Sequence, residues 1–368
     1  MKKYLRKGLS LILATGLAAA MLAGCGGSSS SGSSSGAASS GTDAAKEEST
    51  DTTAAADTSS TASDAEFTLK IGGQWADSSV HSRMIKEVFI PEVEEKSGGR
   101  IKCEFYGNNA VGNEVDQLSQ LQMNTLQMAT LSDQSATLDQ ANLTVLYLPY
   151  LFEDEAHWEA VVDGEIGQEL VANLPSQGIR VLGYSENGYR QVTTAKKAIN
   201  TAEDMKGLKM RVTSSDMYIA IFEALGCSCQ AMTIAEAYTA LETGTCDGQD
   251  NAYNTIVNAN FNEVQKYLAN TNHVLGSLYI AVSETWYQTL PDDLKTAVQE
   301  AVTDACVWER QTYRELAEED HKKLLDAGMT ETNPDIESFK EATSVVYDKF
   351  IQKYPEMEDV IARIQSAK

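Results

Sequence analysis

Histidine, cysteine and proline are scarce in this sequence, and cationic residues are far outnumbered by acidic ones. Four His in 368 residues disfavour a histidine-rich metal site, and six Cys are too few for a disulfide scaffold. The 29 Lys and Arg stand against 53 Asp and Glu, and this net charge of −24 repels the phosphates of nucleic acids. Mean hydropathy is −0.29, which excludes a polytopic membrane protein. We therefore expect a globular protein with no cofactor and no nucleic-acid partner.

One short apolar run near the start has the form of a secretory signal. Residues 1–24 combine a cationic beginning with an apolar stretch too short for a comfortable membrane span. The run ends in Leu22-Ala23-Gly24-Cys25, which resembles the lipobox of bacterial lipoproteins. In that motif the cysteine thiol accepts the lipid, so we expect Cys25 to tether the protein to the outer face of the cytoplasmic membrane. The alternative is a chance cysteine after an ordinary signal, which would leave the protein in the periplasm.

Residues 26–65 have the composition of a linker. Of these 40 residues, 33 are Ser, Ala, Thr or Gly, and none is Leu, Ile, Val, Met or aromatic. Such a segment cannot bury enough apolar surface to offset the entropy of ordering it. We expect a disordered tether over 25–65, followed by a folded part over 66–368.

Alternating and helical spacings of apolar residues indicate two α/β units in the folded part. The first unit has expected strands at 67–71, 101–105, 128–131 and 179–184, with helices at 82–97, 115–122 and 154–174. Pro91 should kink or divide the first of these helices. The second unit, over 199–251, repeats the order of strands and helices. A βαβαβ order favours a largely parallel, doubly wound sheet in each unit.

A long helix is expected near the end of the chain. Residues 292–327 contain neither Gly nor Pro, Pro291 precedes them and Gly328 follows them. At 1.5 Å per residue a continuous helix here would be roughly 50 Å long. Because that length exceeds one small lobe, we expect the helix to brace both lobes.

An ordered series of short motifs resembles the substrate-binding proteins of TRAP transporters, of the DctP type. The motifs are Gly98-Gly99-Arg100-Ile101, Leu148-Pro149-Tyr150-Leu151-Phe152, Asn187-Gly188-Tyr189-Arg190-Gln191, Thr201 to Val212, Glu236 to Leu241, Asp247-Gly248-Gln249-Asp250-Asn251, and Glu263 to Tyr267 with Asn272-His273. The resemblance spans essentially all of 66–368, and it implies a two-lobed periplasmic-binding-protein-like fold with hinge strands and a long helix bracing both lobes. Lobe I would comprise 66–187 with about 277–316, and lobe II 188–276 with about 317–368.

The resemblance also implies a function and three binding residues. Proteins of this type capture a small organic acid in the cleft and deliver it to the membrane permease subunits. By motif position, Arg211 would pair with the ligand carboxylate, and Arg190 and Asn251 would line the same pocket. A guanidinium suits this role because its planar donors match the two oxygens of a carboxylate. The alternative roles are a hinge brace for Arg190 and a turn residue for Asn251.

Alternation along the strand at 209–213 predicts the direction of the Arg211 side chain, and the alternative role for this arginine is a surface or salt-bridge residue. Met210 and Val212 point to one face of this strand, and Arg211 points to the other. On the first lobe, Gln74, His81 and Asp133 lie in loops that should face the cleft, although each suits an ordinary loop or N-cap role as well. Trp75 could stack on a sugar ring, and a partly buried core position is the alternative.

Two departures from the usual family pattern lie beside the expected pocket. Asp250 and Ala252 stand where Glu and Pro more commonly flank the asparagine, and Cys227-Ser228-Cys229 introduces two thiols. We interpret the thiols as small buried side chains, because a lone C-x-C with no matching histidine is a weak metal or redox signal. The departure at 250 and 252 affects the identity of the ligand more than carboxylate binding itself.

No enzyme motif is convincing in this sequence. It has no H-E-x-x-H and no phosphate-binding P-loop, and its one G-x-S-x-G match lies in the linker without a strand or helix around it. We therefore expect a monomeric, extracytoplasmic binding protein for a sugar acid such as a uronate, or for a C4-dicarboxylate. The alternatives are an ABC-type receptor, a receptor linked to a sensor, and a secreted hydrolase.

Overall fold

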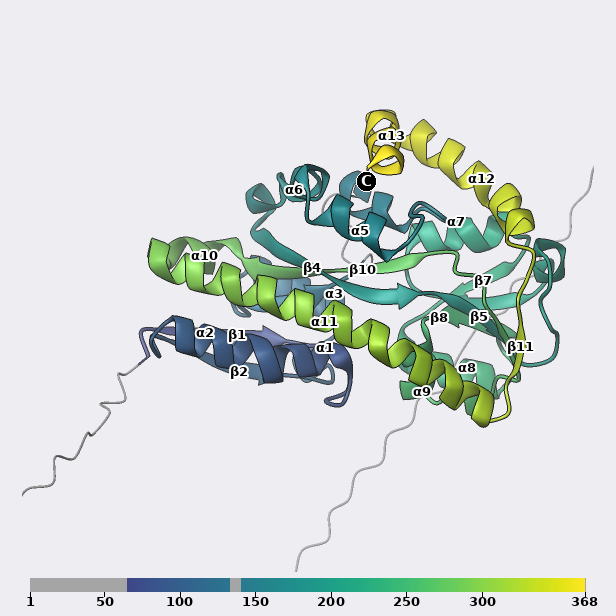
Figure 1. The fold of residues 1–368 in the computed structure, drawn as a ribbon, viewed down its shortest axis with the longest axis horizontal. Helices are drawn as coiled ribbons and strands as arrows, with labels where there is room; N and C mark the ends of the chain where they lie inside the picture. Colours follow the sequence, from purple (N-terminus) through teal and green to yellow (C-terminus); the bar gives the residue numbers. More distant parts are fainter. Residues whose placement is uncertain (1–64, 133–139, 368) are drawn as a thin grey trace, which may run out of the picture. The chain divides into compact units, whose positions relative to one another are not determined.

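The structure, a computed structural model, describes residues 65–132 and 140–367, all within the unit formed by residues 60–368. Cys25 and Asp133 lie outside the described residues. The first sheet has the strand order β2 (Ile101–Tyr106), β1 (Phe67–Gly72), β3 (Met128–Leu131), β10 (Leu275–Ser283) and β4 (Ile179–Tyr189). The second has the order β11 (Thr330–Thr332), β9 (Tyr267–Ala269), β5 (Gln191–Thr194), β8 (Gly248–Asn251), β6 (Lys209–Val212) and β7 (Ser228–Ala231). We call the parts built on these sheets lobe I and lobe II (Figure 1).

Helices connect and cover the strands in both lobes. Those before the second sheet are α1 (Val80–Arg83), α2 (Ile90–Lys96), α3 (Glu114–Gln122), α4 (Gln140–Thr144), α5 (Glu155–Val162) and α6 (Glu165–Val171). The later ones are α7 (Asp216–Ala224), α8 (Ile234–Glu242), α9 (Tyr253–Asn258), α10 (Glu284–Thr289), α11 (Asp292–Asp326), α12 (Ile336–Lys353) and α13 (Met357–Ser366). In the described part of the chain, short 3₁₀ turns cover Val145–Tyr147, Leu174–Gln177, Ala202–Met205 and Phe261–Glu263.

Each sheet combines the expected parallel unit with an antiparallel strand. Strands β1, β2 and β3 pair in parallel, and so do β6, β7 and β8, as the βαβαβ order predicts. However, β10 is antiparallel to β3 and β4, and β5 is antiparallel to β8 and β9. The expectation of largely parallel sheets was therefore only half right. The reason is topological: β4 leads the chain out to lobe II and β10 brings it back, so the two strands must run in opposite directions.

The helix at 80–96 shows how Pro91 is accommodated. Its middle six residues, Met84–Phe89, form a π-helical turn between α1 and α2. Proline has no N–H to donate, and its ring collides with the carbonyl four residues earlier in a regular α-helix. The wider turn directly before Pro91 relieves that collision, so the helix continues without a break.

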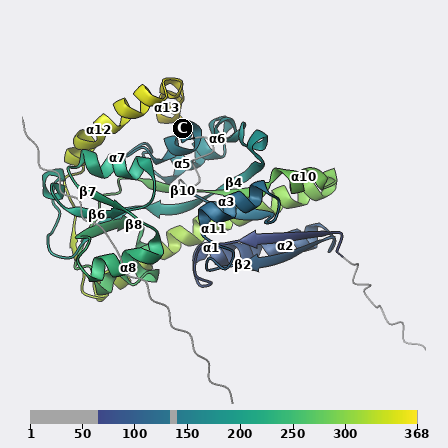
Figure 2. The ribbon, with the colours of Figure 1, turned by 180° about the vertical axis from the view of Figure 1, so that it is seen from behind.

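Helix α11 packs against both lobes, as expected from the absence of Gly and Pro. It has 35 residues and contacts β4 and α2 of lobe I as well as α9 of lobe II. Figure 1 shows it as one long helix that passes β4 and continues to α9. Figure 2, the view from behind, shows α8 and the strands β6, β7 and β8 on the other side of lobe II.

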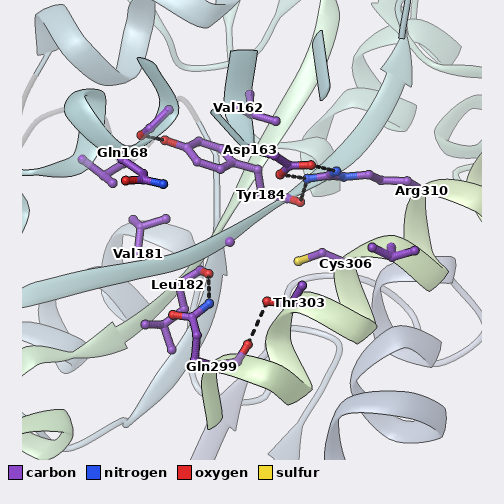
Figure 3. Close-up of a pocket in the computed structure, with 14 residues that line it drawn as sticks. Val162, Asp163, Gln168, Val181, Leu182, Tyr184, Gln299, Thr303, Cys306 and Arg310 are labelled. Atoms are coloured by element: carbon purple, nitrogen blue, oxygen red, sulfur yellow. Dashed lines mark hydrogen bonds and ion pairs between the residues drawn. The ribbon is translucent and has the colours of Figure 1, made fainter. Parts of the chain in front are cut away.

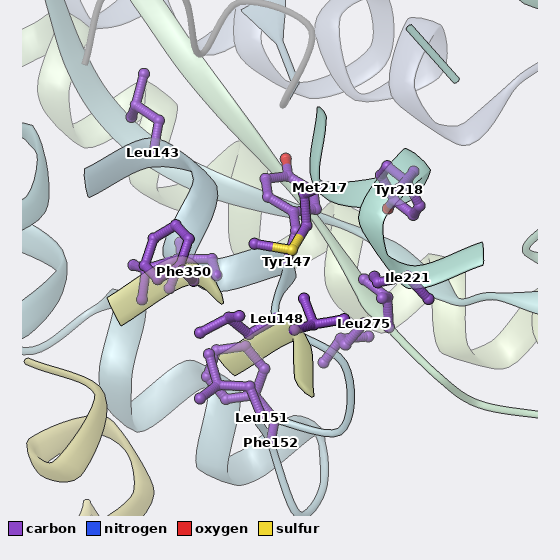
Figure 4. Close-up of a cluster of buried hydrophobic side chains, with 14 of the residues drawn as sticks. Leu143, Tyr147, Leu148, Leu151, Phe152, Met217, Tyr218, Ile221, Leu275 and Phe350 are labelled. Carbon is purple, nitrogen blue, oxygen red and sulfur yellow. The ribbon is translucent and has the colours of Figure 1, made fainter. Parts of the chain in front are cut away.

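The C-terminal helix α12 packs against elements from two distant parts of the sequence. Phe350 of α12 joins Tyr147, Leu148, Met217 and Ile221 in one buried cluster (Figure 4). The Tyr347 hydroxyl donates to the Pro149 carbonyl at 2.9 Å, and α12 also contacts α7. These contacts attach α12 to the 145–152 segment and to α7 together. The lobe boundaries given above stay a prediction.

The strand β4 bulges at the point where it leaves lobe I, and α11 holds this bulge. The pairing of β4 with β10 shifts register around Gly276, and Gly188 has φ +65°. A Cβ atom at Gly188 would lie 2.6 Å from Tyr313 Cε1, while the Tyr313 hydroxyl donates to the Asn187 carbonyl at 3.2 Å. Only glycine combines this backbone conformation with so close a ring.

We predict that Gly188→Ala destabilises the protein by about 2–4 kcal/mol, because alanine is strained at positive φ and its methyl group would displace the Tyr313 ring. Gly207→Ala is the matched control, since Gly207 has φ +78° and no atom would lie within 4 Å of its Cβ. Gly207→Ala should lower the free energy of unfolding by only about 1 kcal/mol. Urea denaturation measures both losses, and equal losses would show that the Tyr313 contact is unimportant.

A buried carboxylate next to the bulge makes stability depend on pH. Glu186 of β4 accepts from Arg314 Nη2 at 2.6 Å, and burial raises its pKa to about 7 although Arg314 opposes the shift. Between its ordinary pKa of about 4.3 and about 7, the folded state therefore binds more protons than the unfolded state. For a carboxyl with a raised pKa, stability falls as pH rises through this window.

We predict that the free energy of unfolding of the wild type, relative to Glu186→Gln, falls by about 2–3 kcal/mol between pH 5 and pH 8. Glutamine keeps the shape of the side chain but cannot ionise, so the comparison isolates the carboxyl. Denaturant titrations of both proteins at several pH values measure the difference. A difference that is constant over this range would show that Glu186 does not titrate there.

Candidate functional site

A cavity of about 100 Å³ lies between residues of both sheets. We call it the interlobe cleft. It is lined by Gln74, Trp75, Ser132, Tyr147, Asn187, Arg190, Arg211, Thr213, Tyr218, Ile234, Asn251, Thr255, Gly276, Ser277 and Leu278. Four of the residues expected at the binding site, Gln74, Arg190, Arg211 and Asn251, are thus brought together here although they are distant in sequence.

Arg211 reaches the cleft because its neighbours on β6 point into the core. Met210 and Val212 are fully buried on the opposite face of the strand, as their alternation predicts. The Arg211 side chain is itself only 3% exposed, and its Nη2 donates to the Met232 carbonyl at 2.7 Å. The guanidinium is therefore oriented by the protein before any ligand binds.

Arg190 lies in the crossing between β4 and β5 and is held by a buried carboxylate. Its Nε donates to Asp250 Oδ2 at 2.5 Å and its Nη2 to the Asp250 carbonyl at 2.6 Å. Its guanidinium carbon lies 4.6 Å above the Tyr218 ring. Both a brace at the hinge and a ligand contact are compatible with this position, because the side chain bonds Asp250 and also lines the cleft.

Asp250 is fully buried and has a second partner in His273, whose Nε2 lies 3.2 Å from Asp250 Oδ2. Burial alone would raise the pKa of this carboxyl, but Arg190 and His273 outweigh burial and hold the pKa below its usual range. The carboxylate therefore stays ionised beside Arg190.

Asn251 ends β8 and is fixed by a chain of amide and hydroxyl groups. Its Nδ2 donates to Gln249 Oε1 at 2.7 Å, and Gln249 Nε2 donates to Thr193 Oγ1 at 2.9 Å. Because β8 pairs with β5 in the middle of the second sheet, this chain of bonds lies within the core of lobe II. Asn251 is thus positioned for a polar contact in the cleft.

On lobe I, Gln74 and Ser132 line the cleft and both bind the carboxylate of Glu114. Gln74 Nε2 donates to Glu114 Oε2 at 2.7 Å and to the Thr130 carbonyl at 3.4 Å. Ser132 donates to Glu114 twice at 2.7 Å, from its main-chain N to Oε1 and from its hydroxyl to Oε2. Glu114 is 2% exposed, so a buried negative charge lies directly behind this wall.

His81, which we expected in the cleft, lies behind the cleft wall. Its Nε2 is 3.3 Å from Asn187 Oδ1, its Nδ1 is 3.0 Å from Glu309 Oε1, and its ring centroid is 4.4 Å from that of Trp75. His81 therefore supports two residues that do line the cleft, Asn187 and Trp75. Direct contact of His81 with a ligand stays a prediction, as does the role of Asp133.

Two tyrosines of the cleft were not identified from the sequence as site residues. Tyr147 lies in an apolar run and Tyr218 at a helical apolar spacing, so both patterns indicated core positions. They are indeed part of the buried cluster of Figure 4, yet both also line the cleft. The Tyr147 hydroxyl donates to the Ser277 carbonyl of β10.

A second cavity, of about 510 Å³, lies beside the open edge of the first sheet (Figure 3). Its polar wall is formed by Arg310 of α11, whose Nη1 and Nη2 donate to Asp163 at 2.6 and 2.8 Å. Arg310 Nη2 and Gln299 Nε2 also donate at 2.7 Å to the main-chain carbonyls of Tyr184 and Leu182. Since β4 is an edge strand, these bonds satisfy carbonyl groups that no neighbouring strand can reach.

No metal or redox site is found in the described ranges 65–132 and 140–367. Within them no three His, Cys, Asp or Glu side chains are grouped to hold a metal ion, and the five cysteines form no disulfide. Burial raises the pKa of Cys103, Cys227 and Cys306 to about 12 and that of Cys229 to about 11, so these thiols remain protonated. In the same part of the chain, no helix has the length and apolarity needed to cross a membrane.

Comparisons with known proteins agree with this architecture. Residues 71–353 match the family described as bacterial extracellular solute-binding protein, family 7 (DctP). The 2,3-diketo-L-gulonate-binding periplasmic protein YiaO of Escherichia coli (strain K12) is 30% identical over 312 residues, which cover 83% of this chain and 93% of that protein.

Two crystal structures of sugar-acid complexes have a similar fold. One is a TRAP periplasmic solute-binding protein from Sulfitobacter sp. NAS-14.1 with bound β-D-galacturonate, with a TM-score of 0.77, 28% identity, and coverage of 82% of this chain and 100% of that chain. The other is the sugar acid binding protein DctPAm from Advenella mimigardefordensis with galactonate, with a TM-score of 0.77, 28% identity, and coverage of 82% and 99%. The expected two-lobed fold is confirmed. The chain belongs to the DctP family of TRAP-transporter solute-binding proteins, a family of binding proteins and not of enzymes.

Proposed function

We propose that this protein captures a sugar acid in the interlobe cleft, with the ligand carboxylate paired to Arg211, and delivers it to the membrane permease of a TRAP transporter. The observation on which the proposal rests is the meeting of Arg211, Arg190 and Asn251 in one cavity of a chain whose net charge is −24. A protein of this charge repels anions at long range, so an anion site needs cations at fixed, close positions.

The ligands of the relatives support the choice of a sugar acid. Galacturonate and galactonate are bound in the two similar structures, and 2,3-diketo-L-gulonate is named for the relative from E. coli. Each of these molecules has a carboxylate at one end and several oxygen atoms along its carbon chain. Arg211 offers the planar donors that a carboxylate matches, and its fixed position lowers the entropy lost on binding.

Capture would depend on the relative position of the lobes. The cleft is lined from both sheets, so only an arrangement with the lobes close together gives a ligand both sets of contacts. Two strand crossings connect the lobes, one at Arg190 and the other at residues 270–274, and α11 passes alongside. A ligand would therefore shift the population toward the closed arrangement, which the permease would recognise.

We also propose that Cys25 is lipidated and tethers the protein outside the cytoplasmic membrane. Support comes from the Leu22-Ala23-Gly24-Cys25 sequence after an apolar run and from the long small-residue linker that follows it. The relative from E. coli is described as a periplasmic protein. A linker of 40 residues would let the binding unit reach the permease while it stays attached.

We predict that Arg211→Ala weakens binding of galactonate or galacturonate by about 2–4 kcal/mol, which is roughly 30- to 1000-fold in Kd. Arg211→Lys should restore only part of this loss, because lysine has the charge but not the planar donor pair. Arg100→Ala is the control, since Arg100 is an arginine of lobe I that pairs with Glu66 and Asp293 outside the cleft. Titration calorimetry measures all three variants.

Unchanged affinity in Arg211→Ala would contradict the assignment of the carboxylate partner. The ligand should also be recovered chemically unchanged after prolonged incubation, because the proposal includes no reaction. Its conversion would support the alternative of a secreted hydrolase.

We predict that Cys25→Ser releases the protein from the membrane fraction. Serine lacks the thiol that accepts the lipid, so the variant should incorporate no labelled fatty acid and should be recovered in the soluble fraction. Cys103→Ser is the control, because Cys103 lies in β2 of the folded part and should leave the label in place. Equal labelling of the wild type and Cys25→Ser would exclude lipidation at Cys25.

A further inference from the structure

The two walls of the interlobe cleft differ in the hydrogen bonds that they can offer. The lobe II wall includes Arg190 and Arg211, and a guanidinium has donors but no acceptor. The lobe I wall includes Gln74 and Ser132, whose donors are directed away from the cleft toward Glu114.

The amide of Gln74 can have only one orientation. Its nitrogen lies 2.7 Å from Glu114 Oε2 and 3.4 Å from the Thr130 carbonyl oxygen, and a carboxylate and a main-chain carbonyl both accept. Both amide hydrogens are therefore used within lobe I. Among the described residues Gln74 Oε1 has no hydrogen-bond partner, and Gln74 lines the cleft. The atom that Gln74 can offer to a ligand is thus an acceptor.

Ser132 is restricted in the same way. Its hydroxyl hydrogen is donated to Glu114 Oε2 at 2.7 Å, and its main-chain N–H to Glu114 Oε1 at 2.7 Å. A serine hydroxyl has only one hydrogen, so toward the cleft its oxygen can only accept.

Glu114 fixes both residues from behind the wall. It is the first residue of α3, directly after the Asn113 cap, where the helix dipole favours a negative charge. At 2% exposure it is shielded from solvent, so its charge acts on the cleft with little screening. Glu114 is therefore a positioning residue: it turns the donors of Gln74 and Ser132 inward and leaves a negative potential on this side.

We propose that the interlobe cleft selects acids with one carboxylate and several hydroxyls, and rejects the matching dicarboxylic acids and neutral polyols. Hydroxyl groups can donate to the acceptors of lobe I while the single carboxylate meets the arginines of lobe II. A second carboxylate placed beside Gln74 and Ser132 would lie against acceptors, with the charge of Glu114 behind them, and like charges brought together oppose binding. A neutral polyol has no carboxylate to offer to Arg211. This inference deepens the proposed function and rests on it.

The test uses three ligands with one carbon skeleton: galactitol, galactonate and galactarate, which have no, one and two carboxylates. Sorbitol, gluconate and glucarate form a second series. Calorimetry with the full chain should show that galactonate or gluconate binds, that the dicarboxylate of its series binds at least about tenfold more weakly, and that the polyol does not bind.

Gln74→Lys should shift the preference toward the dicarboxylate. Lysine places a donor and a positive charge on the lobe I wall, so the ratio of dicarboxylate to monocarboxylate affinity should rise by at least about tenfold. Gln122→Lys is the matched control, because Gln122 is an exposed glutamine on α3 of the same lobe and does not line the cleft. Glu114→Gln, checked for folding by circular dichroism, should also raise the ratio of dicarboxylate to monocarboxylate affinity, because it removes the negative charge behind the lobe I wall. A purely structural role of Glu114 would leave this ratio unchanged.

The outcomes separate this inference from the proposed function. If no acid of either series binds, the proposed function is contradicted and the inference falls with it. If galactarate or glucarate binds the wild type as tightly as the corresponding monocarboxylate, the inference is wrong while the proposed function stands. An unchanged ratio in Gln74→Lys would also overturn the inference.

Discussion

The buried ion pair between Arg190 and Asp250 joins the crossing between the lobes to the wall of the cleft. Arg190 follows β4, and Asp250 lies on β8 opposite Val192 of β5, the strand that the crossing leads into. Both side chains are buried, so removing either one would leave an uncompensated charge at a cost of about 3–5 kcal/mol. Because Asn251 follows Asp250 directly, the same pair sets the position of two residues of the cleft and the path of the chain between the lobes.

The charge distribution explains how a protein of net charge −24 can offer an anion site. At physiological ionic strength the Debye length is about 8 Å, so the many exposed carboxylates act weakly on a ligand inside the cleft. Arg211, by contrast, is buried at the cleft and held by a main-chain carbonyl. Short-range, weakly screened interactions therefore determine the preference of the site, while the net charge affects mainly the approach of the ligand.

Local sequence patterns predicted those features that depend on near neighbours. The alternation of Met210 and Val212 with Arg211 gave the direction of the Arg211 side chain. The two-lobed fold followed from the order of strands and helices together with the resemblance.

Features that depend on distant partners could not be predicted in the same way. An acidic residue at the start of a helix, such as Glu114, is common for reasons of capping and dipole alone. Its role appears only when residues 40 and 18 positions away, Gln74 and Ser132, are brought to it by the sheet. The direction of β10 likewise depends on the return of the chain from lobe II, which no local pattern records. His81 was expected to face the cleft, and the structure places it beside Asn187 and Glu309, a residue of α11 that is 228 positions away in the sequence.

The cleft and the hinge meet at Asn187. This residue lines the cleft, while its side-chain oxygen contacts His81 and its main-chain carbonyl accepts from Tyr313 of α11. The next residue, Gly188, packs against the same tyrosine ring, and His81 is paired with Glu309 one helical turn away on α11. A ligand that moves Asn187 must therefore change the contacts between the hinge strand and α11. By thermodynamic reciprocity, whatever alters those contacts must change the affinity of the cleft by the same coupling free energy.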